Sequence, residues 1–87
     1  MNLDEIVERL YKYGQRASYG AVGEMVGRPA RSVMSGRPKT PRNSWVVSKT
    51  TGEPSGYLPS ERDPRLGLSR STLTTLDGLV RWLREHP

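Results

Sequence analysis

Glycine and proline interrupt the middle of this chain so often that long helices fit only near its two ends. Six of the seven prolines lie between Pro29 and Pro64, and proline disrupts the interior of both a helix and a central strand. Only 33% of the 87 residues are hydrophobic, so the core is modest. We expect a single domain spanning residues 1–87, with an α+β fold.

Apolar residues recur at helical spacing at each end of the chain. The first stripe predicts a helix over residues 2–13, with Asn2 in a capping box. The second stripe predicts a last helix that Ser71 or Thr72 caps and that ends near Glu85. We expect these two helices to pack against each other and to complete the core.

Two short helices separated by a tight turn are predicted next. Ser18 caps a helix over residues 19–26, in which Gly20 and Gly23 would let another backbone come close. A third helix is predicted over residues 29–35, because proline is favoured at a first helical position. This arrangement is typical of a helix-turn-helix, whose second helix enters a DNA groove.

The remaining segments are predicted to be extended pieces and loops. Residues 15–17 form a short extended piece, and residues 37–43, which contain two prolines, form an extended arm. Residues 45–48 and 56–58 are predicted to pair as a β-hairpin, or wing. A loop covers residues 59–70. Together these elements predict a small winged-helix-like helix-turn-helix domain with a β-hairpin and a C-terminal helix.

Positive charge is concentrated in the middle of the chain. Between Glu24 and Glu53 there are six Lys or Arg residues and no acid, so this window carries +6, whereas the rest of the chain carries −1. The six cations are Arg28, Arg31, Arg37, Lys39, Arg42 and Lys49. A focused basic segment binds polyanions, and DNA is the polyanion that suits it best.

Composition also excludes several kinds of site. The chain has no cysteine, and its only histidine is His86, beside the C-terminus. Disulfides, thiolate zinc sites and thiol nucleophiles are therefore excluded, and we expect no metal, no cofactor, no small-molecule substrate and no enzymatic activity. No apolar run approaches the ~20 residues of a membrane helix, and no signal peptide begins the chain. We expect a soluble cytoplasmic protein, associated with the nucleoid if its host is bacterial.

Eight residues follow one spaced pattern at the start of the chain: Gly14, Arg16, Ser18, Tyr19, Gly20, Val22, Gly23 and Gly27. This pattern resembles the DNA-binding domain of the O-6-alkylguanine-DNA alkyltransferases and alkyltransferase-like proteins, where it is close to G-x-V-x-[ST]-Y-G-x-[IV]-A-x-x-x-G. Later matches are weaker: Arg31 and Val33 fit the family's recognition helix, and Gly56-Tyr57 fits the end of its hairpin. The resemblance covers most of the chain except residues 59–70.

The resemblance implies DNA binding but not alkyl transfer. Asn43 stands where the family has its alkyl-accepting cysteine, and Ser44 and Trp45 replace the adjoining histidine and arginine. An amide cannot replace a thiolate nucleophile. By similarity to the family, Arg31 would be a finger that intercalates or reads the groove, and Tyr19 would lie against a backbone phosphate.

Nine residues are predicted to contact DNA: Tyr19, Arg28, Arg31, Ser32, Arg37, Lys39, Arg42, Asn43 and Trp45. Arg37, Lys39 and Arg42 would bind phosphates. Asn43 would make a polar contact with a base, and Trp45 would stack on one. The competing interpretations are a solvated arm that binds nothing in particular and a core position for Trp45.

The function predicted from the sequence is non-catalytic binding of double-stranded DNA. One alternative is recognition of alkylated or otherwise damaged bases without repair chemistry. A second alternative is a winged-helix adaptor that binds an acidic protein partner. The sequence leaves the oligomeric state open.

Overall fold

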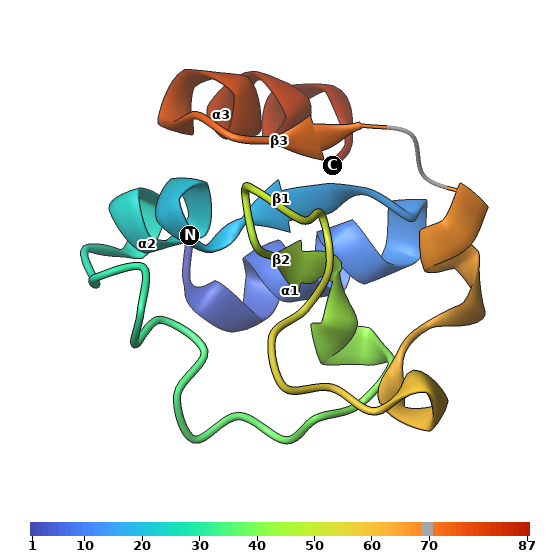
Figure 1. The fold of residues 1–87 in the computed structure, drawn as a ribbon. Helices are drawn as coiled ribbons and strands as arrows, with labels where there is room; N and C mark the ends of the chain where they lie inside the picture. The colour runs from blue at the N-terminus through green and yellow to red at the C-terminus, as the bar shows by residue number, and fades with distance from the viewer. Residues whose placement is uncertain (69–70) are drawn as a thin grey trace.

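A short strand, β1 (Arg16–Ser18), lies at the centre of the structure, with helices on either side of it (Figure 1). The computed structural model describes residues 1–68 and 71–87 of the chain. The helices and strands in chain order are α1 (Leu3–Tyr13), β1 (Arg16–Ser18), α2 (Tyr19–Val26), β2 (Val46–Val47), β3 (Thr72–Leu73) and α3 (Leu76–Glu85). Short 3-10 helices cover Arg42–Trp45, Pro59–Glu61 and Pro64–Leu68. The predicted α+β class is confirmed.

The three strands form one parallel sheet in the order β2-β1-β3. Ala17 of β1 pairs with Val46 on one side and with Leu73 on the other. Parallel strands cannot be joined by a tight turn, so the chain between β1 and each of its two partners is long. The connection from β1 to β2 contains α2 and residues 27–45, and it carries most of the predicted site.

Helix α1 begins and ends as the sequence predicts. The Asn2 side chain accepts the N–H of Glu5 at 2.9 Å, and the Glu5 carboxylate accepts the N–H of Asn2 at 3.3 Å, which completes the capping box. Gly14 ends the helix in the left-handed conformation, with φ 69°. The apolar face from Leu3 to Leu10 is buried in the core.

The predicted third helix over residues 29–35 is wrong. Residues 30–36 instead form successive turns closed by bonds that span three residues, such as the bond from Ser35 N–H to the Ser32 carbonyl at 3.0 Å. A segment of this length needs a packed apolar face to stay helical, and Val33 is its only fully buried side chain. Within the described residues, α2 is therefore followed by turns and not by a recognition helix.

The predicted hairpin of residues 45–48 and 56–58 is also wrong. Val46 and Val47 pair with β1 and not with the later segment, and no antiparallel pair occurs in the described part of the chain. Both valines are buried, which suits a strand of a parallel sheet better than a solvent-exposed wing. Residues 48–58 form a loop beside the sheet (Figure 1).

The C-terminal helix starts later than predicted. Thr72 and Leu73 pair with β1, which keeps them extended, and Thr75 caps α3 by accepting the N–H of Gly78 at 3.0 Å. The start predicted at Ser71 or Thr72 is therefore wrong. The loop predicted over residues 59–70 contains the two 3-10 helices, and its positions 69–70 lie outside the described residues.

Helix α3 lies next to β3, which forms the edge of the sheet opposite β2, and packs on α2 (Figure 1). It also reaches α1, because the rings of Tyr13 and Trp82 meet edge to face with centroids 5.9 Å apart. The Tyr13 hydroxyl donates to the Pro87 carbonyl at 2.8 Å, which ties the end of the chain to α1. None of the helices in the described ranges has the length and apolar character needed to cross a membrane.

One of the two glycines inside α2 is required by a close backbone contact. The chain turns back over α2 at Gly27, with φ 75°, so a Cβ atom on Gly23 would overlap the carbonyl oxygen of Arg28. A Cβ atom on Gly20 would meet only Ser18 Oγ, at 3.9 Å, which is an ordinary contact. The predicted close approach is therefore confirmed at Gly23 but not at Gly20.

We expect opposite effects from adding one methyl group at these two positions. Gly23→Ala should lower the free energy of unfolding by about 1–3 kcal/mol, because the turn must move to relieve the overlap. Gly20→Ala should raise it by up to about 1 kcal/mol, because alanine is the better helix former. Urea unfolding of both variants measures the difference, and equal effects would contradict the packing described for Gly23.

Candidate nucleic-acid interface

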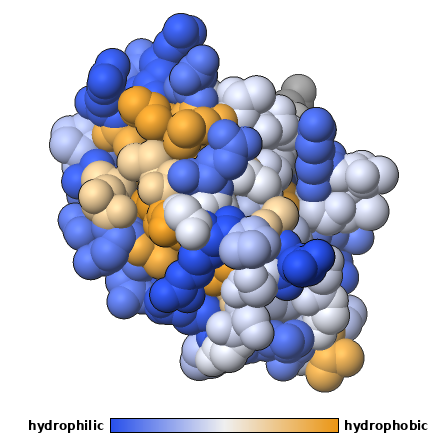
Figure 2. Space-filling model, turned by 90° about the vertical axis from the view of Figure 1, so that its left-hand side faces the viewer, coloured by the Kyte–Doolittle hydropathy of each residue, from blue (hydrophilic) through white to orange (hydrophobic). Residues whose placement is uncertain are grey.

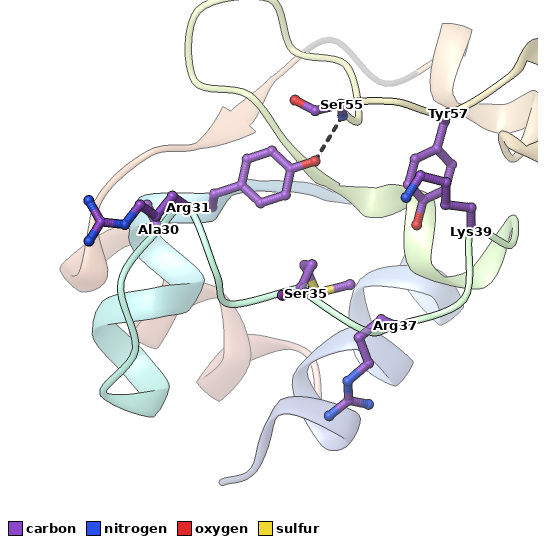
Figure 3. Close-up of a pocket in the computed structure, with 9 residues that line it drawn as sticks. Ala30, Arg31, Ser35, Arg37, Lys39, Ser55 and Tyr57 are labelled. Carbon is purple, nitrogen blue, oxygen red and sulfur yellow. Dashed lines mark hydrogen bonds between the residues drawn. The ribbon is translucent and has the colours of Figure 1, made fainter.

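A pocket of about 260 Å³ opens where α2, the turns after it and the loop after β2 meet (Figure 3). Its lining consists of Tyr19, Ala30, Arg31, Met34, Ser35, Arg37, Lys39, Ser55 and Tyr57. Three of these side chains are cationic and none is acidic. The pocket therefore combines apolar and aromatic surface with positive charge, which suits an anionic ligand that also has a flat or apolar part.

Tyr19 connects the two halves of the pocket. It is the first residue of α2, directly after β1, and its hydroxyl accepts the backbone N–H of Ser55 at 2.8 Å. This bond holds the loop of residues 48–58 against α2 (Figure 3). Because the hydroxyl is an acceptor in this bond, its own proton remains able to donate to a ligand.

Tyr57 lies across the pocket beside Lys39 (Figure 3). The Lys39 ammonium nitrogen is 5.8 Å from the centroid of the Tyr57 ring, a distance at which cation–π attraction operates. Burial, together with the nearby Tyr19 and Glu61, raises the pKa of Tyr57 to about 12. At neutral pH the phenol is therefore uncharged, and it adds no negative charge to the pocket.

The predicted cationic contacts are divided into two groups by their ion pairs. Arg37 is paired with Asp4 of α1, and Arg42 Nε is paired with Glu8 Oε2 at 3.0 Å. Among the described residues, no ion pair forms at Arg28, Arg31 or Lys39, all of which are exposed. The Arg31 guanidinium points outward from the rim of the pocket (Figure 3).

The face that carries α2 and the following turns is mixed in character. Figure 2 shows this face with a band of hydrophobic groups surrounded by strongly hydrophilic side chains. Met25, Val26 and Met34 are only partly buried against the core. A ligand on this face would therefore meet apolar surface between the cations.

Two predicted base contacts need correction. The Trp45 side chain is fully buried, and its Nε1–H donates to Asp63 Oδ2 at 3.1 Å, so its ring offers no free face for stacking. Asn43 is only 6% exposed, and its Nδ2 donates to the Pro38 carbonyl at 2.9 Å. Both side chains support the fold from inside, because the 3-10 helix Arg42–Trp45 faces the core.

Ser32 takes part in its own turn. Its backbone N–H donates to the Pro29 carbonyl at 3.1 Å and its Oγ donates to the same oxygen at 3.4 Å. It is half-buried and does not line the pocket. Tyr57, Met34 and Ser55 do line it, although they are not among the contact residues predicted from the sequence. Tyr57 alone carried a signal, as the tyrosine that follows Gly56 in the family pattern.

Asp63 is a buried acid that no sequence pattern indicated. It is 5% exposed, it accepts the Trp45 Nε1–H, and its carboxylate is bonded by the Arg65 guanidinium with a shortest distance of 2.7 Å. Hydrogen bonds from Arg65 are the main reason why the pKa of Asp63 lies below its usual range. The same guanidinium lies 5.3 Å from the Trp45 ring. This cluster fixes the 3-10 helix that precedes β2.

In the part of the chain that the structure describes, no three His, Cys, Asp or Glu side chains gather in one place. Comparison with known protein families, with curated proteins and with solved structures finds no match to this chain.

The lowered pKa of Asp63 predicts a specific loss of stability in acid. The unfolded chain takes up the proton first, near the ordinary aspartate pKa of about 3.9. The contribution of Asp63 is therefore complete above that pH and is lost as the pH falls through the lower folded-state pKa. Between pH 6 and pH 3, the free energy of unfolding of wild type should fall more steeply than that of Asp63→Asn. Glu24→Gln is the control and should keep the wild-type steepness; parallel curves for Asp63→Asn and wild type would refute the role of Asp63.

Proposed function

We propose that this protein binds double-stranded DNA without catalysing a reaction, using the face formed by the start of α2 and the basic segment, residues 28–42. The observation that carries the proposal is that Arg31, Arg37 and Lys39 all border one pocket, whose lining contains no acidic residue. Phosphate contacts supply most of the affinity in binding of this kind. The resemblance to the alkyltransferase family supports the same surface, since Tyr19 and Arg31 are the residues matched there.

The proposed binding mode is winged-helix-like, because two segments occupy the positions of a recognition helix and a wing. The turns of residues 30–36 take the place of a recognition helix, and the loop of residues 48–58 takes the place of a wing. Arg31 on those turns and Arg28 just before them are exposed and would reach the groove or its phosphates. The Tyr19 hydroxyl, with its proton free to donate, would bind a phosphate oxygen beside Ser55.

A salt titration tests the proposal. If four of the six central cations contact phosphates, log K should fall against log salt concentration with a slope of about −3.5, as measured by fluorescence anisotropy with a short duplex. Arg31→Ala should weaken binding and reduce the slope by about 0.9. The matched control is Arg84→Ala, which removes the same charge from the exposed face of α3. A flat salt dependence, or equal effects of the two variants, would refute the proposed interface.

The pocket favours a second candidate, recognition of a damaged base turned out of the duplex. The rings of Tyr19 and Tyr57 and the Met34 side chain line it, and extruded bases are held between aromatic and apolar side chains. A duplex containing O-6-methylguanine should then bind more tightly than its unmodified counterpart, and Tyr57→Ala should abolish that difference while leaving binding to the unmodified duplex unchanged. Equal affinity of wild type for both duplexes would end this candidate.

A further inference from the structure

Two carboxylates of α1 form ion pairs with two of the guanidinium groups of the basic segment. Asp4 is paired with Arg37, and Glu8 is paired with Arg42. Arg42 also donates from Nη2 to the backbone carbonyl of Asp4 at 3.2 Å. Two of the five cations in residues 28–42 are thus already bonded to carboxylate groups of the same chain.

The geometry of α1 makes this arrangement a matched pair of contacts. Asp4 and Glu8 are four residues apart, so they lie on one face of the helix, about 6 Å apart along its axis. The segment that carries Arg37 and Arg42 lies along that face, and the 3-10 helix Arg42–Trp45 packs against α1. Figure 3 shows the Arg37 guanidinium directed away from the pocket and toward α1, although the residue belongs to the pocket lining.

The exposure of these pairs indicates that they can be exchanged for other contacts. The side chains of Arg37 and Asp4 are 31% and 65% exposed, and those of Arg42 and Glu8 are 36% and 58% exposed. Ion pairs as exposed as these contribute little to stability, because water and salt screen them. The fold therefore does not depend on keeping them closed.

We propose that Asp4 and Glu8 act as an internal competitor for phosphate, which we call the α1 latch, and that the latch sets the affinity of the chain for DNA. This inference rests on the proposed DNA binding. A guanidinium held by a carboxylate has to leave it before it can make a full charge-assisted contact with a phosphate. While both ion pairs are formed, Arg28, Arg31 and Lys39 make the first contacts with phosphates. When the ion pairs open, Arg37 and Arg42 can bind phosphates as well.

The same two ion pairs could instead favour DNA binding, and that role predicts the opposite change in affinity. If Asp4 and Glu8 instead held the arginines in the orientation that binds DNA, removing the carboxylates would cost affinity. The two roles are therefore distinguished by the sign of a single measurement.

The test compares two variants of equal net charge. Asp4→Asn combined with Glu8→Gln opens the latch, and Glu24→Gln combined with Glu85→Gln removes two negative charges from acids that have no ion pair among the described residues. The latch variant should bind a short duplex about three- to tenfold more tightly than the control, since each exposed pair lost removes a competitor of modest strength. Its salt slope should be steeper by up to about 1.8, because two further cations reach phosphates.

A second background separates the latch from the general effect of charge. In a chain that carries Arg37→Gln and Arg42→Gln, the substitutions at Asp4 and Glu8 should change affinity no more than the control substitutions do. Circular dichroism of every variant verifies that α1 is retained. If the substitution at Asp4 disrupts the start of the helix, Glu8→Gln alone is used as the latch variant.

The outcomes separate the latch from the proposed function. Equal or weaker binding by the latch variant than by the control overturns the latch and leaves DNA binding in place. An advantage that persists without Arg37 and Arg42 also overturns it. Absence of salt-dependent DNA binding in wild type and in all variants overturns the proposed function, and the latch with it.

Discussion

The parallel pairing of β1 with β2 is the constraint on which the rest of the structure depends. Strands that run in the same direction need a long connection, and here that connection is α2 followed by the basic segment. Because the buried Val46 and Val47 pair in parallel with β1, residues 27–45, which are rich in proline and cations, must pass around the outside of the molecule (Figure 1). The pocket forms where this excursion meets the loop that follows β2.

Polar as well as apolar contacts hold the 3-10 helix Arg42–Trp45, at the end of this connection, in the core. Trp45 is buried against α1 and donates to Asp63, which is bonded in turn by Arg65. Ser44 Oγ, also buried, accepts the N–H of Asp63 at 3.0 Å. Every polar atom named here has a partner, as buried polar groups require. The basic segment is thus fixed near both of its ends, where the Arg28 carbonyl packs against Gly23 and where the buried Trp45 follows Arg42, while its cations stay at the surface.

Local sequence signals predicted the elements that depend on local contacts. The spacing of apolar residues and the Asn2 capping box specified α1, and Ser18 and Gly27 marked the two ends of α2. The hairpin could not be excluded in this way, because Val46 and Val47 favour a strand whichever partner they have. Their partner is β1, some thirty positions earlier, and no local residue pattern encodes such a pairing. Pro29 and Gly36 bracketed a segment like the ends of a helix, yet Val33 is the only fully buried side chain of that segment, so it lacks the apolar face whose packing would stabilise a helix.

The candidate site was predictable in its charges but not in its interior. The acid-free window located Arg31, Arg37 and Lys39, which the fold brings to one pocket. It did not indicate that Asp4 and Glu8 would occupy two arginines, because that contact depends on how α1 lies against the segment. The burial of Asn43 was equally hidden, since it follows from the 3-10 helix that turns this side chain inward, whereas a core position for Trp45 was one of the interpretations open from the sequence.

The inward orientation of Asn43 has a consequence for any attempt to engineer alkyl transfer into this scaffold. A cysteine installed at this position would inherit a site that is 6% exposed and that faces the Pro38 carbonyl. The neighbouring hydroxyl of Ser44 is already committed to Pro41 and Asp63 and offers no base to ionise a thiol. Burial disfavours the thiolate, and the adjacent Arg42 guanidinium, whose Nη1 lies 3.4 Å from Asn43 Oδ1, is already paired with Glu8. Introducing a nucleophile here would require rebuilding the 3-10 helix, and not merely exchanging one side chain.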